Sequence, residues 1–183
     1  MIDYILHIGG RGGSGKSVLV DALNATLWLE RTKTNTTRKP RFQNEPWYWF
    51  LDEAEFLSKF RSNEIIECYF RKSNQSFYWM SAPGETGIYQ TEIMGLVALR
   101  KWCFQNNIKF LSIYLDISTE TLLERLTRRG DTNETPESRL AEDGYYEEFK
   151  PWSDIVYDYN GKTVEQWVAD MISLMKAKNL IKD

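Results

Sequence analysis

The residues best suited to chemistry lie close to the start of the chain. Gly10, Gly15, Lys16 and Ser17 fit the pattern G-x-x-x-x-G-K-[ST], whose glycines let a backbone wrap around phosphate oxygens. The lysine of this pattern reaches the β- and γ-phosphates of a nucleotide, and the hydroxyl after it can ligate Mg²⁺. We therefore predict an ATP-binding loop with a catalytic Lys16 and Ser17 as metal ligand. Its residues are Gly10, Arg11, Gly12, Gly13, Ser14, Gly15, Lys16 and Ser17.

The segments on either side of this loop fit the same interpretation. Ile2 to Ile8 is an apolar run that predicts a buried strand, and Ser17 to Leu29 has the apolar spacing of a helix. A helix N-terminus places N–H groups and the positive end of its dipole at a bound anion. The alternative, a glycine-rich turn that binds nothing, does not explain the full spacing. His7 has no catalytic partner nearby in the sequence, and we expect it to be structural.

A basic segment follows the predicted helix. Residues 31–41 contain five lysines and arginines and no acidic residue, and we expect an exposed loop there. Arg38 and Arg41 could grip a phosphate dianion through charge-assisted, bidentate bonds. Tyr48 could add a hydroxyl donor, and Glu45 could orient the arginines. The alternatives are a solvated loop or a contact with nucleic acid, and the nearby phosphate loop disfavours both.

Arg38 and its neighbours also carry a resemblance to a known family. The run from Thr36 to Arg41, followed by Glu45, Tyr48 and Phe50, resembles the T-T-R-x-x-R acceptor signature of guanylate kinases. The resemblance implies a kinase that transfers the γ-phosphoryl of Mg²⁺-ATP in line to GMP or dGMP. Such a transfer needs no protein nucleophile, because the acceptor phosphate attacks and the enzyme supplies alignment and charge.

A second basic segment resembles the lid of the same family. Residues 125–130, followed by Arg139, are similar to its R-L-x-x-R-G…R-L pattern, which implies that Arg129 and Arg139 are catalytic. Cations that arrive on closure can neutralise the transferring phosphoryl group and exclude water. The alternative is a helix C-terminus that carries arginines to suit its dipole, and we prefer it for Arg125 and Arg128.

The resemblance implies further residues at the acceptor site. Glu67 matches an acid that accepts hydrogen bonds from guanine N1–H and the 2-amino group, which adenine cannot offer. Thr34 matches a hydroxyl residue that reads guanine O6, Tyr78 an aromatic residue at the acceptor phosphate, and Glu92 an acid near the guanine. The predicted acceptor-binding residues are Thr34, Arg38, Arg41, Glu45, Tyr48, Glu67, Tyr78 and Glu92, and the predicted catalytic residues are Lys16, Arg38, Arg41, Arg129 and Arg139.

The chain departs from the family pattern in the acceptor pocket. Trp79 and Met80 stand where the family has a glycine and a small hydroxyl residue, and Gln90 replaces the first acid of a D-x-D-x-x-G pattern. A divergent kinase for another or modified (d)NMP therefore stays open. A non-catalytic guanylate-kinase-like binding module is a further alternative, but such modules usually lose the lysine of the phosphate loop.

The order of elements predicts an α/β fold of the P-loop nucleoside-monophosphate kinase type, with a parallel sheet flanked by helices. We expect one kinase domain over 1–183, with a core formed by 1–33, 83–125 and 141–183. A small acceptor-binding subdomain would span 34–82, and a lid would span 126–140. The expected elements after the first helix are helices at 53–60, 92–105, 118–129, 137–149 and from 163 onward, and strands at 64–70, 76–81, 88–91, 109–115 and 154–159.

Composition limits the partners that we expect. The 183 residues are 42% hydrophobic and carry a formal charge of −3, which disfavours general binding to nucleic acid. Cys68 and Cys103 form no metal-binding or disulfide pattern, so we expect a cytoplasmic protein. No run of about 20 apolar residues predicts a membrane helix. The expected partners are ATP and a nucleoside monophosphate, and the expected assembly is a monomer or homodimer.

Overall fold

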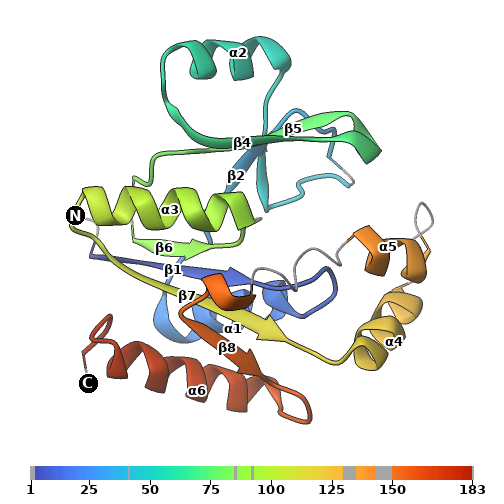
Figure 1. The fold of residues 1–183 in the computed structure, drawn as a ribbon, viewed down its shortest axis with the longest axis vertical. Helices are drawn as coiled ribbons and strands as arrows, with labels where there is room; N and C mark the ends of the chain where they lie inside the picture. Colours follow the sequence, from blue (N-terminus) through green and yellow to red (C-terminus); the bar gives the residue numbers. More distant parts are fainter. Residues whose placement is uncertain are drawn as a thin grey trace.

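The fold is built on two four-stranded sheets that lie one above the other (Figure 1). The computed structural model describes residues 3–40, 42–84, 86–91, 93–129, 135–142 and 150–182. The first sheet has the order β6-β1-β7-β8 and the second the order β3-β2-β5-β4. The predicted α/β fold with a parallel sheet is confirmed, because every pair in the first sheet is parallel.

The first sheet forms because its strands are apolar, and its two central strands β1 and β7 are buried on both faces, as parallel strands are, whereas alternate residues of the edge strand β8 are exposed. Its strands are β1 (Tyr4–Gly9), β6 (Gly87–Tyr89), β7 (Lys109–Asp116) and β8 (Ile155–Asp158). In β1, Ile5, Leu6 and Ile8 are completely buried. The register between β1 and β7 runs without interruption from Tyr4 opposite Lys109 to Gly9 opposite Tyr114. The strands therefore end together, and the loops that follow them meet at one edge.

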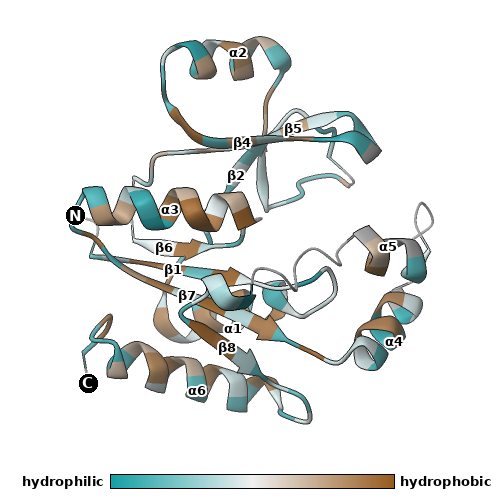
Figure 2. Cartoon of the chain, in the orientation of Figure 1, coloured by the Kyte–Doolittle hydropathy of each residue, from teal (hydrophilic) through white to brown (hydrophobic). Residues whose placement is uncertain are grey.

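Helices cover both faces of this sheet (Figure 2). The helices α1 (Lys16–Leu27) and α6 (Val164–Ala177) share one apolar core with the sheet, and α3 (Ile93–Gln105) packs against the other face. The side chains of β1 alternate accordingly, since Ile5 packs with Leu99 of α3 while Leu6 belongs to the core with α1 and α6. Figure 1 shows α4 (Thr119–Arg129) and α5 (Pro136–Glu142) side by side beyond the end of β7.

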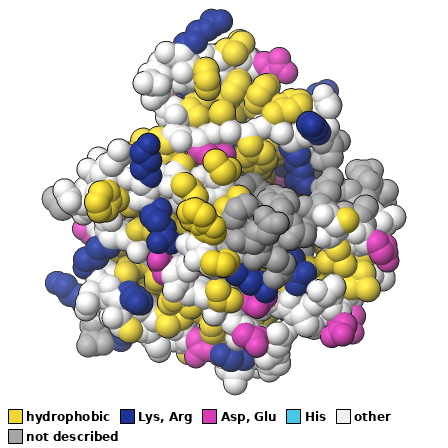
Figure 3. Space-filling model, viewed as in Figure 1, with side chains coloured by type: hydrophobic (Ala, Val, Ile, Leu, Met, Phe, Trp, Pro, Cys, Tyr) yellow, Lys and Arg dark blue, Asp and Glu magenta, His cyan; other side chains and the backbone are white. Residues whose placement is uncertain are grey.

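The second sheet is held by aromatic packing. Its strands are β2 (Thr34–Thr36), β3 (Tyr48–Phe50), β4 (Ile65–Arg71) and β5 (Ser76–Ser81), with a 3₁₀ turn η1 (Lys72–Asn74) between the last two. The helix α2 (Glu53–Arg61) begins with a capping box formed by Asp52 and Glu55 and places Phe56 against Phe77, with the ring centroids 4.4 Å apart. Figure 3 shows hydrophobic side chains gathered on the surface over this region, where Leu57, Phe60 and Phe70 are exposed.

The expectation of an exposed loop over residues 31–41 is wrong. β2 lies inside this segment and pairs with both β3 and β5, and Thr36 is completely buried. Arg38 is also buried, at 9% exposure, because Glu45 supplies a buried carboxylate that neutralises it. The expectation rested on the number of charges in the segment, which does not show that Arg38 is buried when it pairs with Glu45, seven residues further along the chain.

Most other expected elements are confirmed with shifts of one or two residues at their ends. β3 was not expected, and it pairs with β2 in parallel. Of the helix expected over 137–149, the structure describes α5, which ends at Glu142, and residues 143–149 lie outside the described part. Within the described residues, no helix is both long enough and apolar enough to cross a membrane.

His7 is buried in β1 with 2% of its surface exposed. Its Nε2 lies 3.1 Å from the hydroxyl of Thr91, which places the ring between the first sheet and the segment before α3. Burial lowers the pKa of His7 from 6.5 to about 4, because the charged imidazolium would lose its hydration. His7 is therefore neutral in the folded protein at neutral pH, in agreement with a structural role.

The buried His7 should make the protein sensitive to acid. An unfolded chain takes up a proton at His7 near pH 6.5, whereas the folded chain does so only near pH 4, so acid favours unfolding in this interval. We expect the free energy of unfolding to fall by about 2 kcal/mol between a pH of about 7.5 and about 5 through this residue alone. Urea denaturation of wild type and His7→Gln at both pH values measures this difference, which the variant should lack.

Candidate active site

The loop between β1 and α1 has a backbone that side chains would disrupt. Gly10 has a φ of 138°, and a Cβ there would lie 2.8 Å from the Ser14 Oγ and 2.9 Å from the Leu115 carbonyl oxygen. Gly15 has a φ of 89° and precedes the first residue of α1. Glycine is therefore required at Gly10 by both conformation and space. The resulting turn leaves the N-terminus of α1 facing the cavity described below, where its N–H groups can bind an anion.

A buried tyrosine supports the phosphate loop from below. The hydroxyl of Tyr159 donates a hydrogen bond to the carbonyl oxygen of Ser14, and Arg125 Nη1 donates to the same hydroxyl at 3.0 Å. The Tyr159 ring packs edge-on against Trp167 of α6, with 4.3 Å between the ring centroids. Burial raises the pKa of Tyr159, although the positive charge of Arg125 opposes this shift. Arg125, for which a helix-dipole role was expected, thus links α4 to the loop.

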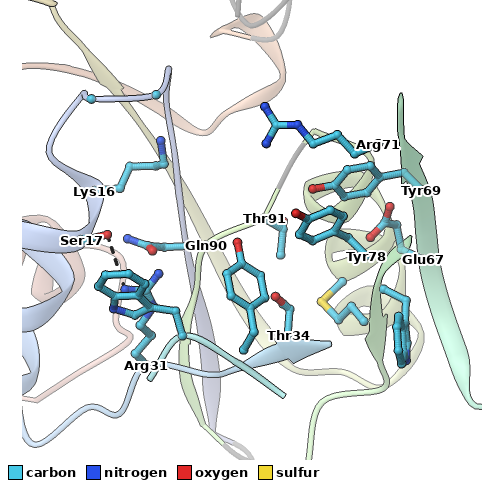
Figure 4. A pocket seen from close by; sticks show the side chains of 16 residues that line it. Lys16, Ser17, Arg31, Thr34, Glu67, Tyr69, Arg71, Tyr78, Gln90 and Thr91 are labelled. Atoms are coloured by element: carbon cyan, nitrogen blue, oxygen red, sulfur yellow. Dashed lines mark hydrogen bonds between the residues drawn. The ribbon is translucent and has the colours of Figure 1, made fainter. Parts of the chain in front are cut away.

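The phosphate loop opens onto a cavity of about 290 Å³ between the two sheets. Figure 4 shows residues of the loop on one side of this cavity and residues of β4 and β5 on the other. The lining residues are Gly12, Gly13, Lys16, Ser17, Arg31, Thr34, Trp47, Tyr48, Glu67, Tyr69, Arg71, Tyr78, Trp79, Met80, Gln90 and Thr91. The structure therefore brings the predicted donor site and the predicted acceptor site to the same cavity.

Lys16 lies at the donor end of the cavity. Its Nζ donates hydrogen bonds to the carbonyl oxygens of Gly10 at 2.7 Å and of Arg11 at 2.8 Å, which hold the ammonium group over the loop. The Arg11 side chain turns away from this cavity and donates to the Ile117 carbonyl oxygen at 2.6 Å. It lines a second cavity of about 370 Å³, together with Asp116, Ser118 and Asn160 among others.

On the acceptor side, Arg38 is held by a bidentate pair with Glu45. The two guanidinium nitrogens lie 2.7 and 3.2 Å from the carboxylate oxygens, and the Glu45 side chain is completely buried. Burial alone would lower the pKa of Arg38, but the hydrogen bonds and charge of Glu45 outweigh it and raise the pKa. The guanidinium also lies 5.3 Å from the ring centroids of both Tyr48 and Phe50. Arg38 lies behind Tyr48 and is not part of the cavity lining.

Tyr48, Tyr78, Glu67 and Thr34 line the cavity as the acceptor assignment requires. The Tyr78 ring stacks on Tyr69, with 5.1 Å between the centroids and an interplanar angle of 8°, and meets Tyr48 edge-on at 5.8 Å. The Tyr78 hydroxyl accepts a hydrogen bond of 2.7 Å from Asn74. These contacts fix the two predicted phosphate-binding hydroxyls beside the wall that carries Glu67.

Other predicted residues fall outside what the structure describes. Arg41 and Glu92 lie outside the described residues. For Arg129 and Arg139 the structure describes the backbones, at the end of α4 and within α5, but not the side chains. Their assignment to the acceptor site and the lid therefore stays a prediction.

The sequence analysis missed five residues that line the cavity, namely Arg31, Trp47, Tyr69, Arg71 and Thr91. Tyr69 and Arg71 follow Glu67 at alternate positions of β4, so one predicted base-reading residue in a strand was enough to place both on the same face. Arg31 belongs to the basic segment over residues 31–41, where no pattern distinguishes a residue that lines the cavity from one on the surface. Arg31 and Arg71 add two cations to a cavity that already contains Lys16.

The arrangement can hold two phosphate groups and a planar base. The lining contains three cationic side chains, Lys16, Arg31 and Arg71, and one carboxylate, Glu67, so the cavity favours anions. Aromatic rings can stack on a base, and Glu67 with Thr34 can hydrogen-bond to its edge. Cys68 and Cys103 are not paired, and the described residues contain no cluster of three or more histidine, cysteine or acidic side chains that could hold a metal.

Comparisons with known proteins agree with this geometry. A guanylate kinase of Mycoplasmopsis pulmonis (strain UAB CTIP) is 26% identical over 189 residues, which cover 96% of this chain and 95% of that protein. The crystal structure of guanylate kinase from Anaplasma phagocytophilum superposes with a TM-score of 0.70 at 19% identity, over 99% of this chain and 88% of that one. No protein-family model matches the chain. The predicted resemblance is confirmed, and this chain is related to guanylate kinases over nearly its whole length and has their fold.

Proposed function

We propose that the protein is a nucleoside-monophosphate kinase that transfers the γ-phosphoryl of ATP to GMP or dGMP. The single observation that carries this proposal is the shared cavity, which joins Lys16 and Ser17 of the phosphate loop to Tyr78 and Glu67 of the second sheet. Phosphoryl transfer requires the donor and acceptor phosphates to meet in line. A single cavity that contains both sites allows the protein to align the two phosphates.

In this proposal the phosphate loop binds the donor. The N–H groups at the start of α1 and the Lys16 ammonium bind the β- and γ-phosphates, and the second cavity beside Arg11 has room for the donor nucleoside. The Ser17 hydroxyl lines the main cavity and fits Mg²⁺, which keeps several waters and takes most other ligands from phosphates. Bound there, the ion would neutralise phosphate charge.

The second sheet binds the acceptor. Tyr48 and Tyr78 donate to the acceptor phosphate, and Arg38 supplies positive charge behind them, oriented by Glu45. Arg41, Arg129 and Arg139 complete the proposed catalytic set, and Glu92 the acceptor set. The same proposal divides the chain into a core (1–33, 83–125 and 141–183), an acceptor subdomain (34–82) and a lid (126–140). It also includes a cytoplasmic location and a monomeric or homodimeric assembly.

The base is assigned to guanine on the chemistry of Glu67 and Thr34. A carboxylate on this wall accepts from N1–H and the 2-amino group, and the threonine hydroxyl can donate to O6. Trp79 and Met80 are 1% and 3% exposed, and their large side chains occupy space on the same wall of the cavity. A different or modified base therefore defines the second candidate function, and a comparison of all common NMPs and dNMPs in an ADP-release assay decides between the two.

Replacement of Lys16 should abolish transfer without unfolding the protein. Lys16→Ala removes a charge that is used mainly as the phosphoryl group moves, and we expect kcat to fall by about 100-fold or more. Circular dichroism and the midpoint of thermal unfolding should stay close to wild type. A turnover near the wild-type value would contradict the donor assignment.

Replacement of Glu67 should affect guanine substrates selectively. Glu67→Gln keeps the size of the side chain but turns one acceptor into a donor that faces the guanine donors. We expect the fall in kcat/KM for GMP and dGMP to correspond to a loss of about 1–3 kcal/mol of transition-state stabilisation. The measurement compares GMP, dGMP, AMP, dCMP and dTMP. Glu64→Gln is the matched control, because Glu64 lies just before β4 and pairs with Lys59 on the surface.

The outcome for the other bases tests the assignment of guanine. Adenine and pyrimidine edges do not present the same pair of donors, so their use should not fall in parallel. An equal loss for every substrate would mean that Glu67 only supports the sheet. A wild-type preference for another base would favour the divergent kinase.

A further inference from the structure

Arg31 occupies a fixed position where the two sheets meet. It lies between α1 and β2, and its backbone pairs with Ile88 of β6 in an isolated parallel bridge. The Ile88 N–H donates to the Glu30 carbonyl oxygen, and the Thr32 N–H donates to the Ile88 carbonyl oxygen, both at 2.9 Å. The backbone on both sides of Arg31 is thus attached to the strand next to β1, so the direction of its side chain is set by the core.

The side chain of Arg31 points into the main cavity beside the phosphate loop (Figure 4). Its Nη1 lies 3.5 Å from the Ser17 Oγ, a long hydrogen bond, and its guanidinium lies 5.5 Å from the ring centroid of Trp47. Arg31 is half-buried, and the loss of surrounding water lowers the pKa of its guanidinium, although the nearby Tyr48 and Asp21 act in the opposite direction. The group nevertheless stays protonated, as arginine does in proteins.

Arg31 differs in its partners from Arg38 and Arg100. Arg38 is paired with Glu45 at 2.7 Å, and Arg100 with Asp154 at 2.9 Å. Within the described ranges no carboxylate forms an ion pair with Arg31. A partly dehydrated guanidinium whose contacts are a neutral hydroxyl and an aromatic face can still gain strongly from an anion.

The surroundings of Arg31 favour a phosphate as that anion. Lys16 and Ser17 lie at the same end of the cavity, and the nearby Gln90 is neutral, with its Nε2 buried and without a hydrogen-bond partner in the described part of the chain. A phosphate group bound beside Ser17 would therefore meet the planar fork of donors of Arg31 as well as the positive charge of Lys16.

We propose that Arg31 is a catalytic residue that binds the γ-phosphoryl group of the donor, opposite Lys16; this proposal rests on the proposed function. Its guanidinium exchanges the Ser17 hydroxyl for two non-bridging γ-oxygens. As an acceptor phosphate oxygen forms the new bond to the γ-phosphorus, the bond to the β-γ bridging oxygen breaks and ADP leaves with that electron pair. Arg31 stays protonated throughout and stabilises charge on the transferring group.

The test separates γ-phosphate binding from support of the fold. Isothermal titration calorimetry in Mg²⁺ compares ADP with AMP-PNP, which carries a γ-phosphate and is not turned over. Arg31→Gln should weaken AMP-PNP about tenfold and ADP less than about twofold, and should lower kcat about 100-fold. Arg31→Lys keeps the charge but loses the fork, so both effects should be smaller. If Arg31→Gln fails to fold, Arg31→Lys provides the same comparison of AMP-PNP with ADP.

Lys33→Gln is the matched control, because Lys33 is a cation of the same segment that stacks on Trp49, 4.3 Å from its centroid, and does not line the cavity. It should leave the preference for AMP-PNP over ADP unchanged. A wild-type preference in Arg31→Gln, or an equal loss in Lys33→Gln, would overturn the proposal. The calorimetric titrations contain no nucleoside monophosphate, so they test Arg31 independently of the proposed function. If the wild type phosphorylates no nucleoside monophosphate, the proposed function is refuted, and the preference of each variant for AMP-PNP over ADP still decides whether Arg31 binds the γ-phosphate.

Discussion

The constraint on which the rest of the structure depends is the lack of space around Gly10. The chain must leave β1 and enter α1 within a few residues, and the Leu115 carbonyl oxygen of β7 lies too close to Gly10 for any side chain. The phosphate loop therefore lies directly against the carboxyl edge of the first sheet. Because Tyr159 and α6 close the space beneath the loop, Lys16 and the N-terminus of α1 can face only the opposite side, where the main cavity lies.

The second sheet completes a site that the first sheet cannot form alone. Residues 30–32 lie between α1 and β2 and form backbone hydrogen bonds with Ile88 of β6. These bonds attach the second sheet to a strand that neighbours β1. Backbone hydrogen bonds to Ile88 therefore contribute to the position of the second sheet relative to the first. Aromatic stacking of Tyr69 on Tyr78 and of Phe56 on Phe77 then makes the wall rigid enough to hold its polar groups in place.

The sequence predicts best what depends on local spacing. The phosphate loop, the parallel sheet and the helices follow from glycine spacing and apolar periodicity, and the structure has them within a few residues of the expected bounds. β2 and β3 were harder to predict because each has three residues, and their stability comes from neighbours up to forty-odd residues away, such as Trp79 opposite Asn35. Arg71 could have been found from the alternation of β4, but the side chain of Arg31 is directed by a contact with Ile88 that no local pattern encodes.

Arg38 and Arg31 show how one residue type can serve two purposes in one basic segment. Arg38 has a buried carboxylate partner that balances its charge, and its guanidinium lies 5.3 Å from the ring centroid of Tyr48. Arg31 contacts a hydroxyl and an indole, so its donors can be transferred to a stronger acceptor at little loss. The two arginines lie beyond opposite ends of β2, and each is held by a different neighbour, the backbone of Arg31 by Ile88 of β6 and the side chain of Arg38 by Glu45.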